Sequence, residues 1–593
     1  MAQGGCADTM SLTTQFFQGR FFVVFSTIMI LSFIGTSYIF GIYSNDIKAT
    51  LGYDQTTLNL ISFFKDFGAY VSVHVGLLGE VSPPWVVLCL GGVVNFVGYF
   101  FIWLSVTHKI ARPPVWLMCL YITIGANSMG FANTGGLVPC VKNFPENRGV
   151  VIGLLKGYIG LGGAVMAQLY HALYGSDNQV EGIILIIAWL PALALILFSF
   201  SVRVLKTVDR QVKREKKFFN QTLYMGLACA AFILVMILVQ RNFEFSRGAY
   251  GASFATIMAL LILPIFLVYR EERYTWKSNR ESNNNQSNSN TNSELKIVSQ
   301  IDAPVSKNKD LVSPSPSVTP TLNSVPWYRN VFSPPVSGED HTILQATFSI
   351  DMIILYLATI CGIGGNLTTI DNLGQIGASL GYSKKSIGTF VSLVSIWQYL
   401  GRVLGGFISE WLLTRFKLPR PLCLTFILFL SCIGHLLIAF DVSYGLYIAS
   451  VILGFCFGAE WTYLFTIISE LFGLKYYATL YNYGSLAAPL GSYIFNVKIA
   501  GHLYDREGIR QLEALGLTRK AGQELVCSGV KCYQLSYIII AACTFFTGVV
   551  SLILVSRTRK FYRGDIYKRF QGGETELPST NDKVSNQDGK GLE

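Results

Sequence analysis

Apolar segments of membrane length follow one another along most of the chain, separated by polar connections. A helix needs about 20 predominantly apolar residues to cross a bilayer. Such segments lie approximately at 21–43, 57–79, 84–105, 114–133, 148–172, 182–204, 219–240, 249–269, 346–368, 386–409, 421–440, 445–469, 476–499 and 534–556. The pattern predicts an all-α polytopic membrane protein with about fourteen spans, grouped as six, two and six.

The second group of six segments repeats landmarks of the first. The tripeptide at 51–53 returns at 380–382, Gly76 and Glu80 return as Gly406 and Glu410, and the tripeptide at 125–127 returns at 458–460. The offsets of 329 to 333 residues indicate two copies of a six-helix unit. Two like halves around a site near the bilayer midplane are typical of secondary transporters.

Composition agrees with a bilayer as the main solvent of the chain. Apolar residues make up 51% of the sequence, charged residues only 14%, and the mean hydropathy is +0.44. The net charge of +11 is concentrated in short segments beside helix ends, which excludes a nucleic-acid partner and leaves membrane lipids and a small solute. No Cys/His cluster has metal-site spacing, so neither a metal nor a cofactor is expected.

Basic residues also predict the orientation of the chain. The clusters at 203–217, 415–420 and 557–569 fall on one face of the membrane, and fewer basic residues fall on the other. The positive-inside rule therefore predicts that both termini are cytosolic. The plasma membrane is favoured over the vacuolar membrane.

The resulting organisation has seven parts. They are a cytosolic N-terminus (1–20), a first six-helix bundle (21–204), a basic cytosolic loop (205–218), two additional transmembrane helices (219–270), a disordered cytosolic linker (271–345), a second six-helix bundle (346–556) and a basic, polar cytosolic tail (557–593). The linker is predicted from its Asn, Ser and Pro content and its scarcity of aromatics.

Ionisable groups inside the spans are the candidates for a solute or ion pathway, because each costs about 2.5–3.5 kcal/mol to insert. Polar partners near expected helix breaks complete the set. It consists of Lys65, Asp66, Asn127, Lys156, Asn366, Arg402 and Glu460. Neighbouring residues on a helix point about 100° apart, so Asp66 is expected to seek a charge on another helix, such as Lys156. The alternative is that these groups form buried ion pairs that only position helices.

Glu460 is the most specific of these candidates, because it is a titratable residue at the position where the first half has Asn127. A carboxyl in apolar surroundings can load and release a proton during transport. The alternative is a permanently protonated group that bonds to a neighbouring helix. His74 and His435 are interpreted as packing residues, and Gly362, Gly364 and Gly365 are expected to loosen the ninth helix.

Glycines also mark gates and helix contacts. The turn with Gly406 and Glu410, followed by Arg415, Lys417 and Arg420, resembles the cytosolic motif of the major facilitator superfamily, in which an acidic residue and arginines form a breakable latch. The first half keeps Gly76 and Glu80 but has Ser-Pro-Pro-Trp at 82–85 in place of the basic residues, which argues against a second latch. Glycines at 153, 157 and 160 predict a flat stripe for close packing or for sliding of a partner helix.

The loop at 501–534 carries Cys527 and Cys532 on the side opposite the cytosol. In an oxidising compartment they are expected to form a disulfide, with reduced thiols as the alternative.

Several local stretches together identify a family. They are Phe40-Gly41-Ile42-Tyr43-Ser44, Phe64-Lys65-Asp66-Phe67-Gly68, Ile370-Asp371-Asn372-Leu373-Gly374-Gln375, Gly401-Arg402-Val403 and the run at 468–477. The chain resembles the plant nodulin-like, nuclear-fusion-defective type of the major facilitator superfamily, everywhere except the tails and residues 275–340. The resemblance implies a nodulin-like first part and a facilitator-type second part. Members are similar to oxalate and monocarboxylate carriers, which fits Lys65, Lys156 and Arg402 favouring an anion.

The sequence thus predicts a secondary active transporter that moves a small polar or anionic solute by alternating access, with protons as the candidate coupling ion. The alternative is a transporter-like receptor or scaffold without flux. An enzyme is not expected, because no His/Asp or Cys/His constellation has catalytic spacing.

Overall fold

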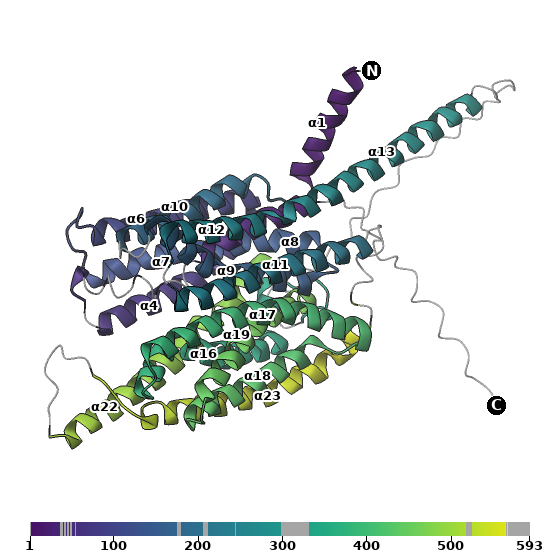
Figure 1. The fold of residues 1–593 in the computed structure, drawn as a ribbon. Helices are drawn as coiled ribbons and strands as arrows, with labels where there is room; N and C mark the ends of the chain where they lie inside the picture. The colour runs from purple at the N-terminus through teal and green to yellow at the C-terminus, as the bar shows by residue number, and fades with distance from the viewer. Residues whose placement is uncertain are drawn as a thin grey trace, which may run out of the picture.

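The computed structural model describes residues 2–35, 40, 43, 47, 50–53, 55–174, 180–205, 212–243, 245–297, 331, 333–516, 525–564 and 566. Within these ranges the elements are helices, with no β-strand. Figure 1 shows two helical bundles lying side by side along their length, one formed by the first half of the chain and one by the second. We call the end at which α1 (Ala2–Gln18) projects the α1 end, and the opposite end, at α22 (His502–Ala514), the α22 end.

The first bundle follows the predicted order of spans. It contains α2 (Arg20–Ile34), α4 (Gln55–Tyr70), α5 (Val73–Val81), α6 (Pro84–Val106), α7 (Val115–Ala132), the π-helix Asn133–Leu137, α8 (Val138–Asn143), α9 (Arg148–Tyr174) and α10 (Val180–Ser199). Helix α9 is almost completely buried, because it packs against both α2 and the second bundle.

The second bundle repeats this arrangement. It contains α16 (Ile350–Ser379), α17 (Lys384–Phe416), α18 (Arg420–Ala439), α19 (Gly445–Leu471), α20 (Tyr477–Ser485), α21 (Ala487–Ser492), the π-helix Tyr493–Gly501 and α23 (Gln534–Arg563), with short α15 (Ile343–Thr347) before it. Helix α19 is the counterpart of α7 in the repeat, and its residues from Cys456 to Leu471 are all buried.

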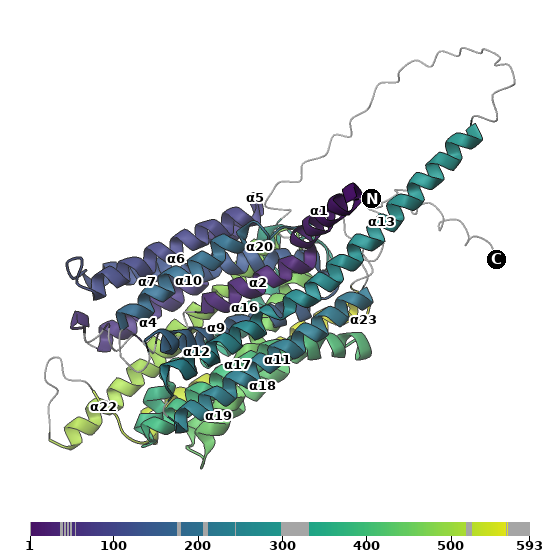
Figure 2. The same ribbon diagram turned by 45° about the horizontal axis from the view of Figure 1, so that its top comes forward.

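Three further helices lie outside these two bundles. They are α11 (Val212–Asn242), α12 (Arg247–Ile262) and α13 (Pro264–Ile297), and both views place them on one side of the molecule (Figure 1, Figure 2). Helix α11 reaches both bundles at Gly226, where an added Cβ would lie 2.6 Å from the Tyr399 hydroxyl and 3.2 Å from the Tyr158 hydroxyl. Helix α11 therefore packs where α9 of one bundle meets α17 of the other, and α12 packs against α9.

Ten helices among the described residues are long and apolar enough to cross a membrane, and the bent pair formed by 8–18 and α2 makes eleven. The other three predicted spans correspond to α4 with α5, to α17, and to α20 through the π-helix at 493–501. Two of these are interrupted and the third carries Arg402 and Glu410, which are features of functional rather than of plain lipid-facing helices.

The positions of helix irregularities differ from the prediction. The ninth span, α16, is a continuous helix through Gly362, Gly364 and Gly365. A Cβ at Gly364 would lie 2.6 Å from the Cα atom of Gly491, so this glycine permits close helix approach rather than unwinding. The chain is instead broken at 71–72, between α4 and α5, and forms π-helices at Asn133–Leu137 and Tyr493–Gly501.

The segment between the bundles also begins differently from the prediction. Helix α13 continues to Ile297, past residue 271, where the disordered linker was expected to start. At the other end of this segment, Asp340 accepts hydrogen bonds from the backbone of Leu474 and Lys475 at 3.0 and 3.1 Å, next to α20. Residues 298–330, residues 206–211 of the predicted basic loop before α11, and the tail from 567 lie outside the described residues.

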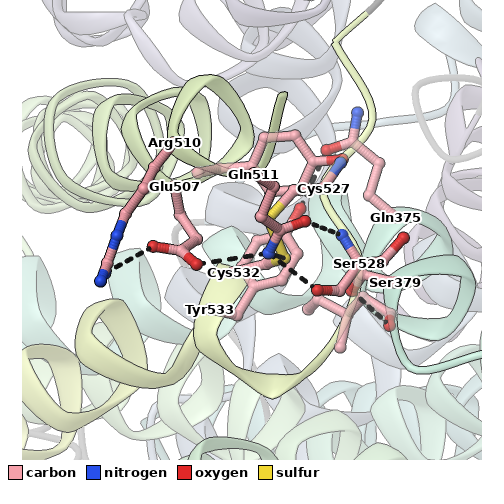
Figure 3. Close-up of a disulfide and its surroundings, with 11 residues drawn as sticks. Gln375, Ser379, Glu507, Arg510, Gln511, Cys527, Ser528, Cys532 and Tyr533 are labelled. Carbon is pink, nitrogen blue, oxygen red and sulfur yellow. Dashed lines mark hydrogen bonds and ion pairs between the residues drawn. A yellow bond between two sulfur atoms is a disulfide. The ribbon is translucent and has the colours of Figure 1, made fainter. Parts of the chain in front are cut away.

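Cys527 and Cys532 are joined in a disulfide at the α22 end (Figure 3). The small loop closed by the disulfide contacts two helices. The Gln511 side chain of α22 bonds to the backbone N and O of Ser528, each at 2.9 Å. The Gly529 N–H donates to the Ser379 carbonyl of α16 at 2.8 Å. The disulfide therefore fixes a connection between α22 and the end of α16.

Cys527→Ser should lower the stability of the full-length protein, because a loop of this size loses about 2 kcal/mol of stabilisation when it is opened. Thermal unfolding with and without reductant measures the effect. The variant should melt lower than the parent in oxidising buffer and should no longer respond to reductant. Equal melting of parent and variant in oxidising buffer would contradict the prediction.

Candidate functional site

Lys156 of α9 extends from the first bundle into an aromatic cage that belongs to the second. Its Nζ lies 5.3, 4.4 and 4.9 Å from the ring centroids of Trp461, Phe465 and Tyr481. Lys156 is 5% exposed, and no carboxylate of the described residues lies within ion-pair distance of its Nζ. Aromatic faces attract an ammonium group but do not neutralise its charge. The predicted pair between Asp66 and Lys156 is therefore wrong.

Arg402 of α17 adds a second buried cation beside Lys156. Its Nη1 donates to the Lys156 carbonyl at 3.1 Å. A Cβ at Gly160 would lie 3.2 Å from this Nη1 atom of Arg402. The glycine thus lets the guanidinium lie directly on the backbone of α9. Two cations of opposite bundles meet here inside the protein.

Tyr70 closes the cage from the first bundle by stacking on Trp461, with ring centroids 5.1 Å apart. Tyr70 is the last residue of α4, directly before the break at 71–72. Asn127 stabilises this break, because its Nδ2 donates to the carbonyls of Gly68 and Val71 at 2.8 and 3.0 Å. Asn127 is therefore a positioning residue for Tyr70, and its Oδ1 bonds in turn to His74 Nε2 at 3.1 Å.

A second group of charges lies closer to the α22 end. Lys65 and Asp66 of α4 pair with each other, with Nζ 3.1 Å from Oδ1, and both are buried. Asp371 of α16 interacts electrostatically with both, although it is itself exposed. Charges of the two bundles thus meet beside the exposed carboxylate of Asp371.

Glu460 faces the interior of the second bundle, away from the Lys156 cage. Its Oε1 accepts hydrogen bonds from Asn366 Nδ2 at 3.2 Å and Ser431 Oγ at 3.5 Å. A Cβ at Gly362 would lie 2.8 and 2.9 Å from the two carboxylate oxygens, so this glycine makes the space that the carboxylate occupies. Asn127 and Glu460 are equivalent in the repeat, but their contacts differ. Asn127 bonds to the helix break at 71–72, whereas Glu460 bonds inside the second bundle.

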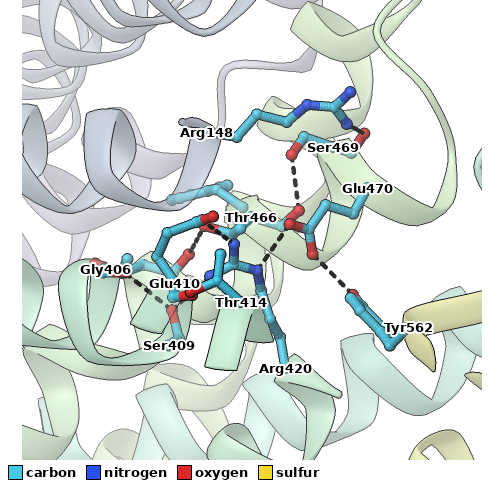
Figure 4. Close-up of polar contacts among 12 residues, drawn as sticks. Arg148, Gly406, Ser409, Glu410, Thr414, Arg420, Thr466, Ser469, Glu470 and Tyr562 are labelled. Atoms are coloured by element: carbon cyan, nitrogen blue, oxygen red, sulfur yellow. Dashed lines mark hydrogen bonds and ion pairs between the residues drawn. The ribbon is translucent and has the colours of Figure 1, made fainter. Parts of the chain in front are cut away.

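A buried ionic trio, which we call the α1-end latch, joins Glu410, Arg420 and Glu470 (Figure 4). Arg420 is fully buried; its Nη2 pairs with Glu410, its Nε donates to Glu470 Oε1 at 2.7 Å and its Nη1 to Ser409 Oγ at 2.6 Å. Tyr562 donates to the other Glu470 oxygen at 2.9 Å. Of the three basic residues predicted after Glu410, Arg415 and Lys417 are exposed, and Arg420 is the one that forms the latch.

The first half also has a bonded acidic residue at this end, against the expectation from its sequence. Glu80 accepts a hydrogen bond from the Thr479 N–H at 3.2 Å, within the first turn of α20, where a carboxylate is favourable. Lys142 of α8 lies 3.6 Å from its other oxygen and supplies the cation that residues 82–85 lack. Glu80 therefore connects the first bundle to the second.

Both bundles contribute equivalent glycines to the closure of the α1 end. A Cβ at Gly76 would lie 2.7 Å from the Thr479 Cα atom, and a Cβ at Gly406 would lie 2.4 Å from the Gly149 carbonyl oxygen. Gly76 and Gly406 are 330 residues apart, and so are Gly149 and Thr479. The contact is therefore repeated with the roles of the halves exchanged, as expected for two copies of one unit.

The complete architecture resembles a known class of membrane protein. The structure of the major facilitator superfamily proton:xylose symporter XylE, bound to 6-bromo-6-deoxy-D-glucose, matches with a TM-score of 0.51 at 12% identity, over 93% of this chain and 96% of that chain. This chain has the fold of major facilitator superfamily transporters, as its sequence predicted, and that superfamily is one of transporters rather than enzymes.

Comparison of sequences then defines the family. Residues 20–269 match the Nodulin-like family, and residues 344–564 match the NFD4 C-terminal domain. Protein NUCLEAR FUSION DEFECTIVE 4 of Arabidopsis thaliana is 24% identical over 547 residues, which are 91% of this chain and 89% of that protein. Probable transporter MCH1 of Yarrowia lipolytica is 26% identical over 214 residues, 34% of this chain and 41% of that protein. The chain belongs to the nodulin-like, nuclear-fusion-defective family, and its fold is that of the major facilitator superfamily.

Proposed function

We propose that this protein is a secondary active transporter that moves a small anionic solute by alternating access, coupled to protons. The Lys156 cage is the observation that carries the proposal. A buried ammonium without a carboxylate partner is costly, and an anionic ligand would offset that cost. Lys156 would contact the anion, and Arg402 would add to the positive potential around it.

The contacts at the α1 end support alternating access. Gly76 and Gly406 allow the bundles to touch backbone to backbone there, while Asp371 is exposed nearer the α22 end. We assign the α1 end to the cytosol on the positive-inside rule, which makes this state closed toward the cytosol. Rocking of the bundles would break the Glu80–Thr479 bond and open that side.

Glu460 is our candidate for the coupled proton, because it is an acid buried among groups that can bond to either of its protonation states. Asn366 supplies an amide and Ser431 a hydroxyl. Its position apart from Lys156 would allow the solute and the proton to bind at separate sites and communicate through α19. We place the protein in the plasma membrane.

Lys156→Gln should abolish solute uptake into vesicles reconstituted with the full-length protein. Loss of one partner of a buried charge pair costs about 2–5 kcal/mol, which is a factor of about 30 or more in affinity. The measurement is uptake and counterflow of radiolabelled mono- and dicarboxylates of two to four carbons, with glucose as the neutral comparison.

Lys109→Gln is the matched control, because Lys109 also lies on an aromatic ring, 4.1 Å from the Trp103 centroid, but is exposed. It should transport like the parent protein. Uptake of glucose but of none of the carboxylates would overturn the anionic assignment. Saturable binding without flux or counterflow would instead identify a receptor.

A further inference from the structure

The interior of the second bundle contains several buried polar atoms without a protein partner. Glu460 Oε2, Asn366 Oδ1 and both ring nitrogens of His435 have no hydrogen bond within the described residues, and each residue is at most 1% exposed. Such atoms are almost always satisfied in native proteins, by water where no protein group reaches them. We therefore expect ordered water in this region.

His435 lies one helical turn from Ser431 on α18, and Ser431 bonds to Glu460. The space beside its ring is kept open by Gly365, where an added Cβ would lie 3.3 Å from His435 Nε2. Histidine was interpreted from sequence as packing, but a packed imidazole would bond through at least one nitrogen. Its two unbonded nitrogens instead suit exchange of protons with water.

The same cluster extends toward the exposed carboxylate of α16. The Tyr537 ring of α23 lies 5.8 Å from the His435 ring. The Tyr537 hydroxyl lies near the Thr369 side chain and interacts electrostatically with Asp371. Asp371 is the one exposed member of this group. A path of polar groups thus runs from Asp371 through Tyr537 and His435 to Glu460.

We propose that the second bundle contains a hydrated proton path from Asp371 to Glu460, with His435 and Tyr537 as its relay groups, separate from the Lys156 site. This inference rests on the proposed proton coupling and names its route. A proton leaving Glu460 passes to water, the water gives a proton to His435, and the Tyr537 hydroxyl accepts one proton while it donates its own toward Asp371. Glu460 then remains as a carboxylate until the path reloads it.

Other titratable groups surround the path and do not replace its members. Near Glu460 they are thiols from α16, α18 and α19; near Asp371 they are charges from α4. These groups are Cys361, Cys432, Cys456, Lys65 and Asp66. Thiols surrounded by apolar side chains behave as small apolar groups, so the imidazole and the phenol are the relays that remain.

His435→Gln and Tyr537→Phe test the path, because both keep the shape of the side chain and remove the relay. Each should slow proton uptake after a pH jump at least tenfold, since a positioned proton relay contributes about 100-fold or more. A pH-sensitive dye reports uptake by the purified full-length protein, and carboxylate counterflow in vesicles should stay within twofold of the parent. Glu460→Gln should remove the proton uptake itself.

His171→Gln is the matched histidine control, because His171 lies in the last turn of α9, where it stacks on Tyr250 outside the path. It should behave like the parent, and thermal unfolding confirms that each variant is folded. Parental uptake rates in both relay variants would overturn the path. Failure of the proposed function shows differently, as absence of counterflow for every carboxylate while proton uptake and its response to the variants persist.

Discussion

Replacing Arg420 with methionine is expected to destabilise the protein by about 3–5 kcal/mol, because it leaves two buried carboxylates without their cation. Arg420 is fully buried and is bonded to Glu410, Glu470 and Ser409. It also touches the first bundle, since a Cβ at Gly149 would lie 2.6 Å from its Nη1. Chemical unfolding in detergent measures the loss.

The triple variant Arg420→Met, Glu410→Gln, Glu470→Gln is the matched comparison. Most of the loss in the single variant comes from two buried carboxylates without a cation, and the triple variant removes both charges, so it should recover most of the loss. The Tyr562 bond to residue 470 survives in it, because a Gln oxygen still accepts. A single variant as stable as the parent protein would show that the trio contributes no net stabilisation.

The spans and the repeat could be predicted from sequence because both are properties of local composition. Membrane-length apolar runs predict helices wherever they occur, and the offset of 330 residues places Gly76 and Gly406 at equivalent contacts, as the structure shows. The continuous α16 could not be distinguished from a loosened helix, because glycines serve close packing and unwinding equally well.

The partners of buried charges were less predictable, because they depend on how each helix is rotated about its axis. Glu460 and Trp461 are neighbours in sequence, but the turn of about 100° between them directs one toward Asn366 and the other toward Lys156. Arg415 and Arg420 were equally plausible by spacing, and only the start of α18 brings Arg420 onto Glu410. The aromatic cage was not predicted, because aromatic residues occur in most spans and no charge distinguishes the cage members from packing residues.

Replacing Gly153 with leucine is expected to hold the protein open at the α1 end. A Cβ at Gly153 would lie 2.6 Å from the Arg402 carbonyl oxygen and 3.0 Å from the Gly406 Cα atom, and neither backbone atom can move aside cheaply. Overpacking of this kind costs about 3 kcal/mol, which lowers the population of the closed state about 100-fold. In the proposed alternating-access cycle the bundles meet here only when this end is closed, so the open state would carry none of that cost.

Spin labels at Val81 and Lys417, both exposed and on opposite bundles at the α1 end, would report the change as a shift to longer distances. Net transport should fall in proportion to the loss of closed-state population. The affinity of the open state for protons should not change. Gly251→Leu is the control, because nothing lies within 4 Å of a Cβ there, and it should behave like the parent. Gly153 was predicted only as part of a packing or sliding stripe. An unchanged distance in Gly153→Leu would mean that the contact is packing and not a gate, and alternating access would then need another moving interface.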